Sequence, residues 1–211
     1  MLSPPQPPIL TAGPYLVIPE TEVAEVKCIS RGGKPPASLV WRLNGLPLTS
    51  GVEERIEMIS ESKRSMTVSS VMLTGVRNMT GSVLECEVSG QENMRVSSEI
   101  VIEHPPEVRL ELESGEAEVR EADTIKVFCS AVASPDLVEY QWHLAGEEVV
   151  EARGATELVL TATRRLHNKR VTCLARNKVG QNSADLVLDI KCELGRGPRG
   201  PDCHLIYSKT G

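Results

Sequence analysis

Aromatic side chains are scarce in this chain of 211 residues. They make up 3% of it, as one phenylalanine, two tryptophans and three tyrosines. Hydrophobic residues nevertheless reach 40%, a share typical of globular proteins. We therefore expect cores built mainly from Val, Ile, Leu and Met, in which the few aromatic residues mark special positions.

The chain also lacks a surplus of positive charge. Its formal net charge is −6 at pH 7, with acidic residues in both halves. Such a chain offers no basic face to neutralise a phosphate backbone, so nucleic acid is not an expected partner.

Long apolar runs are missing as well. No run approaches the ~18 apolar residues that a membrane-spanning helix needs. The segment from Met1 to Leu10 is rich in proline, and it lacks the basic and apolar parts of a secretory signal. We therefore expect a membrane link only through an anchor in a longer parent protein.

Four of the six cysteines form a pattern that occurs twice. Each set has a tryptophan thirteen residues after its first cysteine, and the second set begins 101 residues after the first (129 − 28). This order and period are typical of immunoglobulin domains, in which a tryptophan packs on a disulfide between two sheets. We predict one disulfide within each set and an oxidising compartment, with free core cysteines as the alternative. The two sets are Cys28, Trp41, Cys86 and Cys129, Trp142, Cys173.

Short segments of alternating hydrophobicity surround both sets, and no helical period is sustained. They predict an all-β fold of two tandem immunoglobulin-like antiparallel β-sandwiches of the C2/I-set type. We expect domains at residues 1–104 and 105–191, joined at Pro105 and Pro106, and a short flexible tail at 192–211. The predicted strands centre on 24–30, 39–43, 66–73, 83–88, 96–103, 125–131, 140–144, 158–162, 171–177 and 184–190.

The remaining two cysteines, Cys192 and Cys203, fall in the tail next to His204. Sulfur and imidazole are good zinc ligands, but these three residues lack the paired short spacings of a structural zinc site. We expect a local disulfide or two free thiols there, and no metal.

One glycosylation sequon is present, Asn78-Met79-Thr80. It falls between two predicted strands, where an exposed turn can carry a glycan. Asn78 is therefore a candidate glycosylation site.

Catalytic chemistry has little support. The four histidines are scattered over the chain, and neither a nucleophile elbow nor a glycine-rich phosphate loop accompanies any of them. We expect no enzyme and no cofactor.

Several runs resemble the second and third immunoglobulin domains of the nephrin and kirre family of adhesion proteins. The resemblance covers residues 5–191 and rests on Pro5 to Pro8, Val17 to Thr21, Cys28 to Ala37, Pro105 to Val108, Tyr140 to Trp142 and Asn177 to Gly180. It implies a cell-surface receptor that binds the same or related immunoglobulin-superfamily receptors on adjacent cells. In that family the partner-binding face belongs mainly to the most N-terminal domain, so no contact residue is carried over.

The leading hypothesis is cell–cell adhesion or recognition at the cell surface, with this chain as an ectodomain fragment or isoform acting by protein–protein binding. An intracellular structural immunoglobulin-repeat protein of the muscle-filament type is one alternative. A secreted receptor decoy is another.

Overall fold

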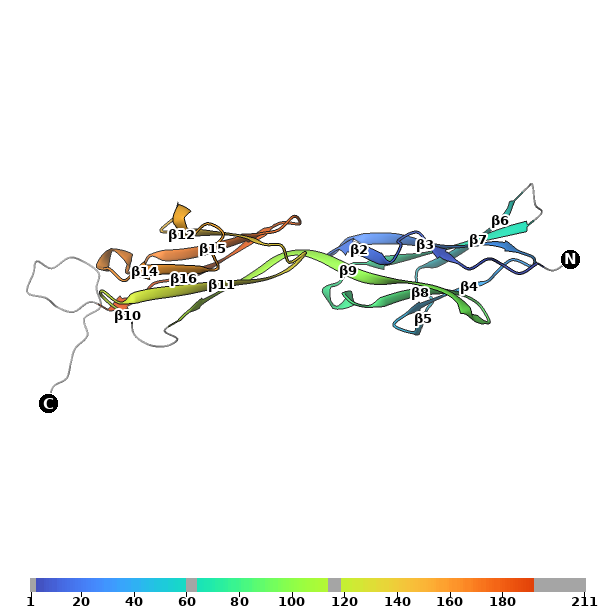
Figure 1. Cartoon of the computed structure of the whole chain (residues 1–211), viewed down its shortest axis with the longest axis horizontal. Coiled ribbons are helices and arrows are strands. Elements are labelled where there is room, and N and C mark those ends of the chain that lie inside the picture. Colours follow the sequence, from blue (N-terminus) through green and yellow to red (C-terminus); the bar gives the residue numbers. More distant parts are fainter. Residues whose placement is uncertain (1–2, 60–63, 114–118, 192–211) are drawn as a thin grey trace, which may run out of the picture. The chain divides into compact units, whose positions relative to one another are not determined.

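The computed structural model describes residues 3–59, 64–113 and 119–191, which form two compact units divided between Glu103 and His104 (Figure 1). The described residues form strands and three short 3₁₀ turns: η1 (Arg77–Met79), η2 (Val150–Ala152) and η3 (Arg164–Leu166). The predicted all-β class is confirmed. The tail with Cys192 and Cys203 lies outside the described residues.

The first unit consists of two sheets. One is antiparallel with the order β1-β3-β7-β6, and the other has the order β9-β8-β4-β5, with β2 added in parallel beside β9. The strands are β1 (Ile9–Leu10), β2 (Tyr15–Pro19), β3 (Val23–Gly33), β4 (Leu39–Leu43), β5 (Leu46–Leu48), β6 (Val52–Ile59), β7 (Arg64–Thr74), β8 (Val83–Val88) and the first part of β9 (Gln91–Leu112).

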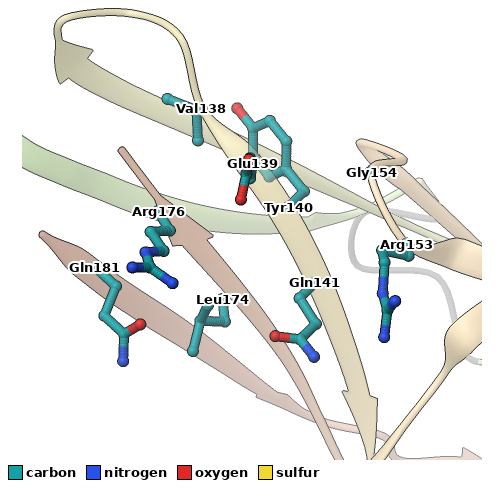
Figure 2. Close-up of a pocket in the computed structure, with 9 residues that line it drawn as sticks. All are labelled: Val138, Glu139, Tyr140, Gln141, Arg153, Gly154, Leu174, Arg176 and Gln181. Carbon is teal, nitrogen blue, oxygen red and sulfur yellow. The ribbon is translucent and has the colours of Figure 1, made fainter. Parts of the chain in front are cut away.

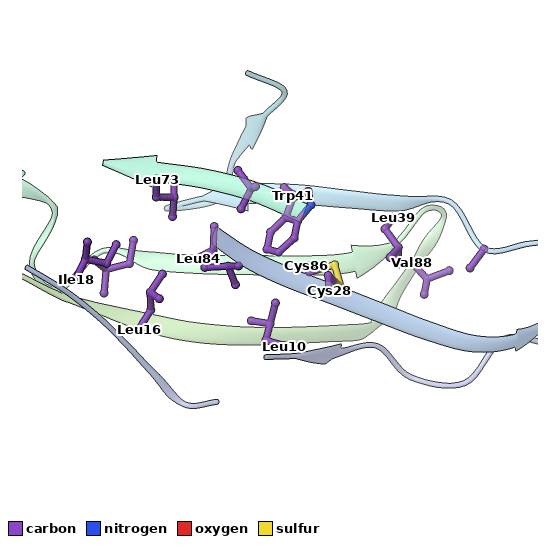
Figure 3. Close-up of a cluster of buried hydrophobic side chains, with 14 of the residues drawn as sticks. Leu10, Leu16, Ile18, Cys28, Leu39, Trp41, Leu73, Leu84, Cys86 and Val88 are labelled. Carbon is purple, nitrogen blue, oxygen red and sulfur yellow. A yellow bond between two sulfur atoms is a disulfide. The ribbon is translucent and has the colours of Figure 1, made fainter. Parts of the chain in front are cut away.

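The core of this unit lies between the two sheets, as the alternation of apolar residues requires. In β3, Val26 and Cys28 are buried, whereas Glu25, the residue before Val26, is exposed on the opposite side of the strand. Figure 3 shows Trp41 and Leu84 close to the disulfide of Cys28, with aliphatic side chains from both sheets around them. Two inward-facing strands joined by a disulfide under a tryptophan are the hallmark of the immunoglobulin sandwich.

The inner side of β7 departs from this aliphatic pattern. Ser65, Thr67 and Ser69 are buried there, and their hydroxyls donate to the backbone oxygens of Gly33, Ala37 and Glu53, respectively. Because buried polar groups cost stability unless they are hydrogen-bonded, these bonds make the hydroxyls tolerable in the core.

The second unit repeats the scheme of two facing sheets. The last part of β9 pairs with β11, which pairs with β14, and the opposite sheet has the order β13-β12-β15-β16. A short parallel pair joins β10 to β17. The strands are β10 (Val119–Arg120), β11 (Thr124–Ser134), β12 (Glu139–Leu144), β13 (Glu147–Glu148), β14 (Glu157–Thr161), β15 (Arg170–Arg176), β16 (Gln181–Val187) and β17 (Ile190–Lys191).

Its core is aliphatic around Trp142 and the second disulfide, with Val127, Leu158 and Val171 buried against them. The prolines at 105 and 106 lie within β9, where the backbone is extended. That conformation suits proline, whose ring fixes the backbone angle and disfavours a helix before it.

Candidate protein-interaction faces

A disulfide and a tryptophan hold the two sheets of each unit together. The S–S lengths are 2.01 Å for Cys28–Cys86 and 2.09 Å for Cys129–Cys173, and both bonds span 6.4 Å between Cα atoms. Both pairings are those predicted from the sequence. Trp41 and Trp142 are buried beside them, and the outer faces of the sheets are among the surfaces left for contact.

In the first unit, the outer face of β4, β8 and β9 is covered by charged side chains. Arg42 donates from Nε and from a terminal nitrogen to Glu87 Oε1, at 3.1 and 3.0 Å. Arg95 lies 3.6 Å from Glu85. These pairs neutralise the middle of the face, while Glu99 is exposed on β9 between Tyr15 and Val83 in register.

In the second unit, the corresponding face carries a hollow of about 520 Å³ beside β12 (Figure 2). Leu174 is the apolar side chain on its sheet floor, in register with Gln141 on one side and Ser183 on the other. The view places Arg176 and Gln181 on the neighbouring strands and Arg153 at the opposite end. The lining combines polar and apolar groups, from residues Val138, Glu139, Tyr140, Gln141, Arg153, Gly154, Leu174, Arg176 and Gln181.

The two ends of this hollow differ in electrostatics. At one end the guanidinium of Arg153 donates to Glu148 Oε1 from Nε at 3.0 Å and from a terminal nitrogen at 2.5 Å. Hydrogen bonds from Arg153, and then from Gln141, lower the pKa of the Glu148 carboxyl. At the other end Glu139 and Arg176 face each other in register, and neither has an ion-pair partner within 4.0 Å among the described residues.

Such faces can bind a protein surface, because they combine a hollow, exposed polar groups and a rigid sheet. Within residues 3–59, 64–113 and 119–191, no three His, Cys, Asp or Glu side chains gather in a group that could hold a metal ion. In the same part of the chain, no helix is long and apolar enough to span a bilayer.

Comparisons with known proteins agree with the fold and find adhesion proteins among those similar to the chain. Residues 5–95 match the family of CD80-like C2-set immunoglobulin domains. The Irregular chiasm C-roughest protein of Drosophila melanogaster is 23% identical over 216 residues, which cover 90% of this chain and 28% of that protein. Kin of IRRE-like protein 1 of Homo sapiens is 24% identical over 196 residues, covering 90% of this chain and 25% of that protein.

The predicted resemblance to the nephrin and kirre family is confirmed. Relatives in this family are cell-adhesion and recognition proteins of the immunoglobulin superfamily. The chain spans about a quarter of the length of these relatives. Among solved structures, the ectodomain of mouse nectin-like molecule 4 is similar in fold, with a TM-score of 0.68 and 22% identity over 92% of this chain and 67% of that one.

The structure also places the candidate modification site. Asn78 is exposed on η1, just before β8. The hydroxyl oxygen of Thr80, the third residue of the sequon, accepts a hydrogen bond from the Ile102 backbone N–H at 3.2 Å. Whether a glycan occupies Asn78 stays a prediction.

The hollow itself was missed by the sequence reasoning. Its signal was present in the alternation of residues 139–144 and 171–177: if Trp142 and Cys173 point inward, then Gln141 and Leu174 must point outward. What the alternation cannot supply is the wall formed by Arg153 and Gly154, which depends on how the chain returns from β13.

Proposed function

We propose that this chain acts in cell–cell adhesion and recognition, by protein–protein binding, as part of the ectodomain of an immunoglobulin-superfamily receptor. The observation that supports this most is that each disulfide-bonded sandwich exposes a rigid outer sheet face, in a chain that is similar to adhesion proteins. Sheet faces give specificity through charge and shape rather than through an enclosed pocket. Catalysis and a cofactor are not needed for this role.

An extracellular setting follows from the same proposal. Two cross-sheet disulfides persist where thiols are kept oxidised, as outside the cell, and are rare in the cytosol. This favours a surface or secreted protein over an intracellular filament protein.

The test is a binding assay with the full chain. Beads coated with the oxidised chain are mixed with cells that display the same chain, the roughest protein or Kin of IRRE-like protein 1. We expect saturable binding to at least one of them. Beads that carry a Cys28→Ala/Cys86→Ala variant are the control for the need for a folded first unit. If the folded chain binds none of these cells above uncoated beads, the proposal is wrong.

We also propose that Asn78 carries an N-linked glycan when the chain passes through the secretory pathway. Its exposed position on η1 supports this. Secreted chain should lose mass on treatment with a peptide N-glycosidase, and Asn78→Gln should remove that loss. Asn93→Gln, at an exposed asparagine outside any sequon, is the matched control. Asn78→Gln is preferred over a change at Thr80, because Thr80 also bonds to Ile102. Secreted wild-type chain without a glycan would refute this proposal.

A further inference from the structure

The two unpaired charges in the hollow of the second unit have opposite signs and lie side by side. Glu139 on β12 is opposite Arg176 on β15, and both side chains are exposed. Among the described residues neither has an ion-pair partner within 4.0 Å. The pair therefore presents one cation and one anion to whatever covers the face.

We propose that this face binds a second copy of the chain, face to face about a two-fold axis, with Arg176 of each copy on Glu139 of the other. In a two-fold interface the same patch is used on both sides, so that if one residue contacts another, the reverse contact is also made. Because Arg176 and Glu139 are neighbours of opposite charge, two copies can form the Arg176–Glu139 contact twice, once in each direction. The inference rests on the proposed adhesive function, because it names the partner of one such face.

The row next to these charges is compatible with the same axis. Gln141, Leu174 and Ser183 stand in register across β12, β15 and β16 and carry no charge. A face-to-face axis that puts Arg176 on Glu139 of the other copy runs between β12 and β15, so it also puts Gln141 of each copy on Leu174 of the other. Leu174 offers an apolar contact to the aliphatic part of the Gln141 side chain, and neither residue brings a like charge into the interface.

The remaining charges on this face are already matched within the unit. Arg153 is bonded to Glu148, and Arg170 lies 3.1 Å from Asp185, which also accepts from the Thr172 hydroxyl at 2.7 Å. These ion pairs have no net charge, so they cause little repulsion between two approaching copies.

The first unit does not meet the same condition. The charges in the middle of its face are paired internally, Arg42 with Glu87 and Arg95 with Glu85. Glu99 is left exposed between Tyr15 and Val83 in the cross-strand register. Two such faces would bring like charges together, which disfavours self-association. The proposal is therefore specific to the second unit.

Charge exchange in the full chain tests the proposal. Sedimentation over a range of concentrations should show wild-type self-association, and both Arg176→Glu and Glu139→Arg should weaken it by at least about tenfold, since each puts like charges in contact twice. An equimolar mixture of the two variants should associate again, because both contacts then join opposite charges. Arg165→Glu and Glu111→Arg, at exposed residues of the same unit outside this face, are the matched controls and should associate like the wild type.

The outcomes separate this inference from the adhesive function. A wild-type chain that stays monomeric up to millimolar concentration overturns it, and so does a mixture of variants that fails to associate. If wild-type beads bind cells with related receptors and Arg176→Glu reduces only that binding, the face serves a different protein and the second-copy proposal is wrong, whereas adhesion stands. Near-ultraviolet circular dichroism of each variant shows whether the tryptophan environments, and with them the folds, are intact.

Discussion

In the first unit, Ser69 on β7 stands opposite Cys28 and its hydroxyl lies beside Trp41, whereas in the second unit β14 begins only at Glu157, so none of its residues stands opposite Cys129. The difference extends to the tryptophans themselves. Trp41 Nε1 donates to the Ser69 hydroxyl at 2.9 Å, but Trp142 Nε1 donates to the backbone oxygen of Ala155 at 2.8 Å. The same buried donor is thus satisfied by a side chain in one unit and by the backbone in the other.

The hydroxyls of β7 also hold the segment between β3 and β4. Ser65 and Thr67 donate to the backbone oxygens of Gly33 and Ala37. In the second unit, the matching segment is held from the other sheet, because the side-chain amide of Asn177 donates to Pro135 O at 3.1 Å. The comparison teaches that the same fold can hold this segment and its tryptophan by different hydrogen bonds, provided that the buried polar groups at these positions find partners.

The largest effect in either unit should come from its disulfide. The bonds close segments with sequence separations of 58 and 44, for which the chain-entropy relation gives about 4 kcal/mol each. We expect Cys28→Ala/Cys86→Ala and Cys129→Ala/Cys173→Ala to lower the free energy of unfolding of their own units by similar amounts. Calorimetry of the full chain measures both. A cost confined to one pair would mean that the two disulfides are not equivalent.

The acceptors of the two tryptophans should give the next largest difference. Ser69→Ala leaves the Trp41 N–H buried without its partner, which costs about 2 kcal/mol of unfolding free energy in the first unit. Ala155→Ser in the second unit changes a side chain but keeps the carbonyl that accepts from Trp142, so it should cost less than about 0.5 kcal/mol. Denaturant unfolding followed by tryptophan fluorescence compares them. Equal effects would show that the acceptor type is unimportant.

Much of the frame could be predicted from the sequence, because its signals are local. The cysteine and tryptophan spacing and the period of two in segments such as 83–88 follow from which side chains must point inward, and β8 has these bounds. Neither β2 nor β6 was predicted, because their residues do not alternate: residues 15–18 form a continuous apolar run, and residues 53–58 of β6 are all exposed. Short edge strands depend on tertiary pairing, as does the parallel addition of β2 to β9.

The candidate faces were less accessible to sequence reasoning. Whether an exposed charge is already paired depends on cross-strand neighbours far apart in the chain, as for Arg42 and Glu87. The same holds for Ser69, whose role as the acceptor for Trp41 requires the two sheets to be in place. Register, rather than residue type, decides these contacts.

The turns after β4 and β12 have the same geometry but a different residue at one position, so the residue of each turn can be placed in the other. Asn44 and Ala145 occupy the same turn position with positive φ of 51° and 55°, each followed by a glycine. Asparagine accepts this conformation more readily than alanine, and the Asn44 side chain also accepts from the Val83 N–H at 2.9 Å. We expect Asn44→Ala to destabilise the first unit by about 1 to 2 kcal/mol and Ala145→Asn to stabilise the second by about 1 kcal/mol. Thermal unfolding tests both, and changes of the same sign would contradict the shared turn geometry.

A smaller effect of opposite sign is expected at Ser98. Its hydroxyl is buried and has no hydrogen-bond partner among the described residues, whereas the matching position on β16 is Leu186, packed against the core. An unsatisfied hydroxyl costs free energy in the folded state, so Ser98→Ala should raise the unfolding free energy of the first unit by about 0.5 to 1 kcal/mol. Ser69→Ala serves as the contrast, because there the hydroxyl is used. Destabilisation by Ser98→Ala would show that the hydroxyl contributes to stability.

The smallest effect is electrostatic and belongs to the hollow of the second unit. Hydrogen bonds from Arg153 and Gln141 lower the pKa of the Glu148 carboxyl in the folded state. A folded pKa below the unfolded one means that the contribution to stability is present at neutral pH and is lost as the pH falls through the acidic range. Arg153→Met should therefore raise the Glu148 pKa toward its ordinary value and flatten this part of the pH dependence, which NMR titration of the carboxyl carbon measures. In the first unit, Arg42→Met is the matched change at an arginine that also donates twice to one carboxylate oxygen, and it should leave Glu148 unaffected. An unchanged Glu148 pKa in Arg153→Met would place the cause of the shift in Gln141 instead.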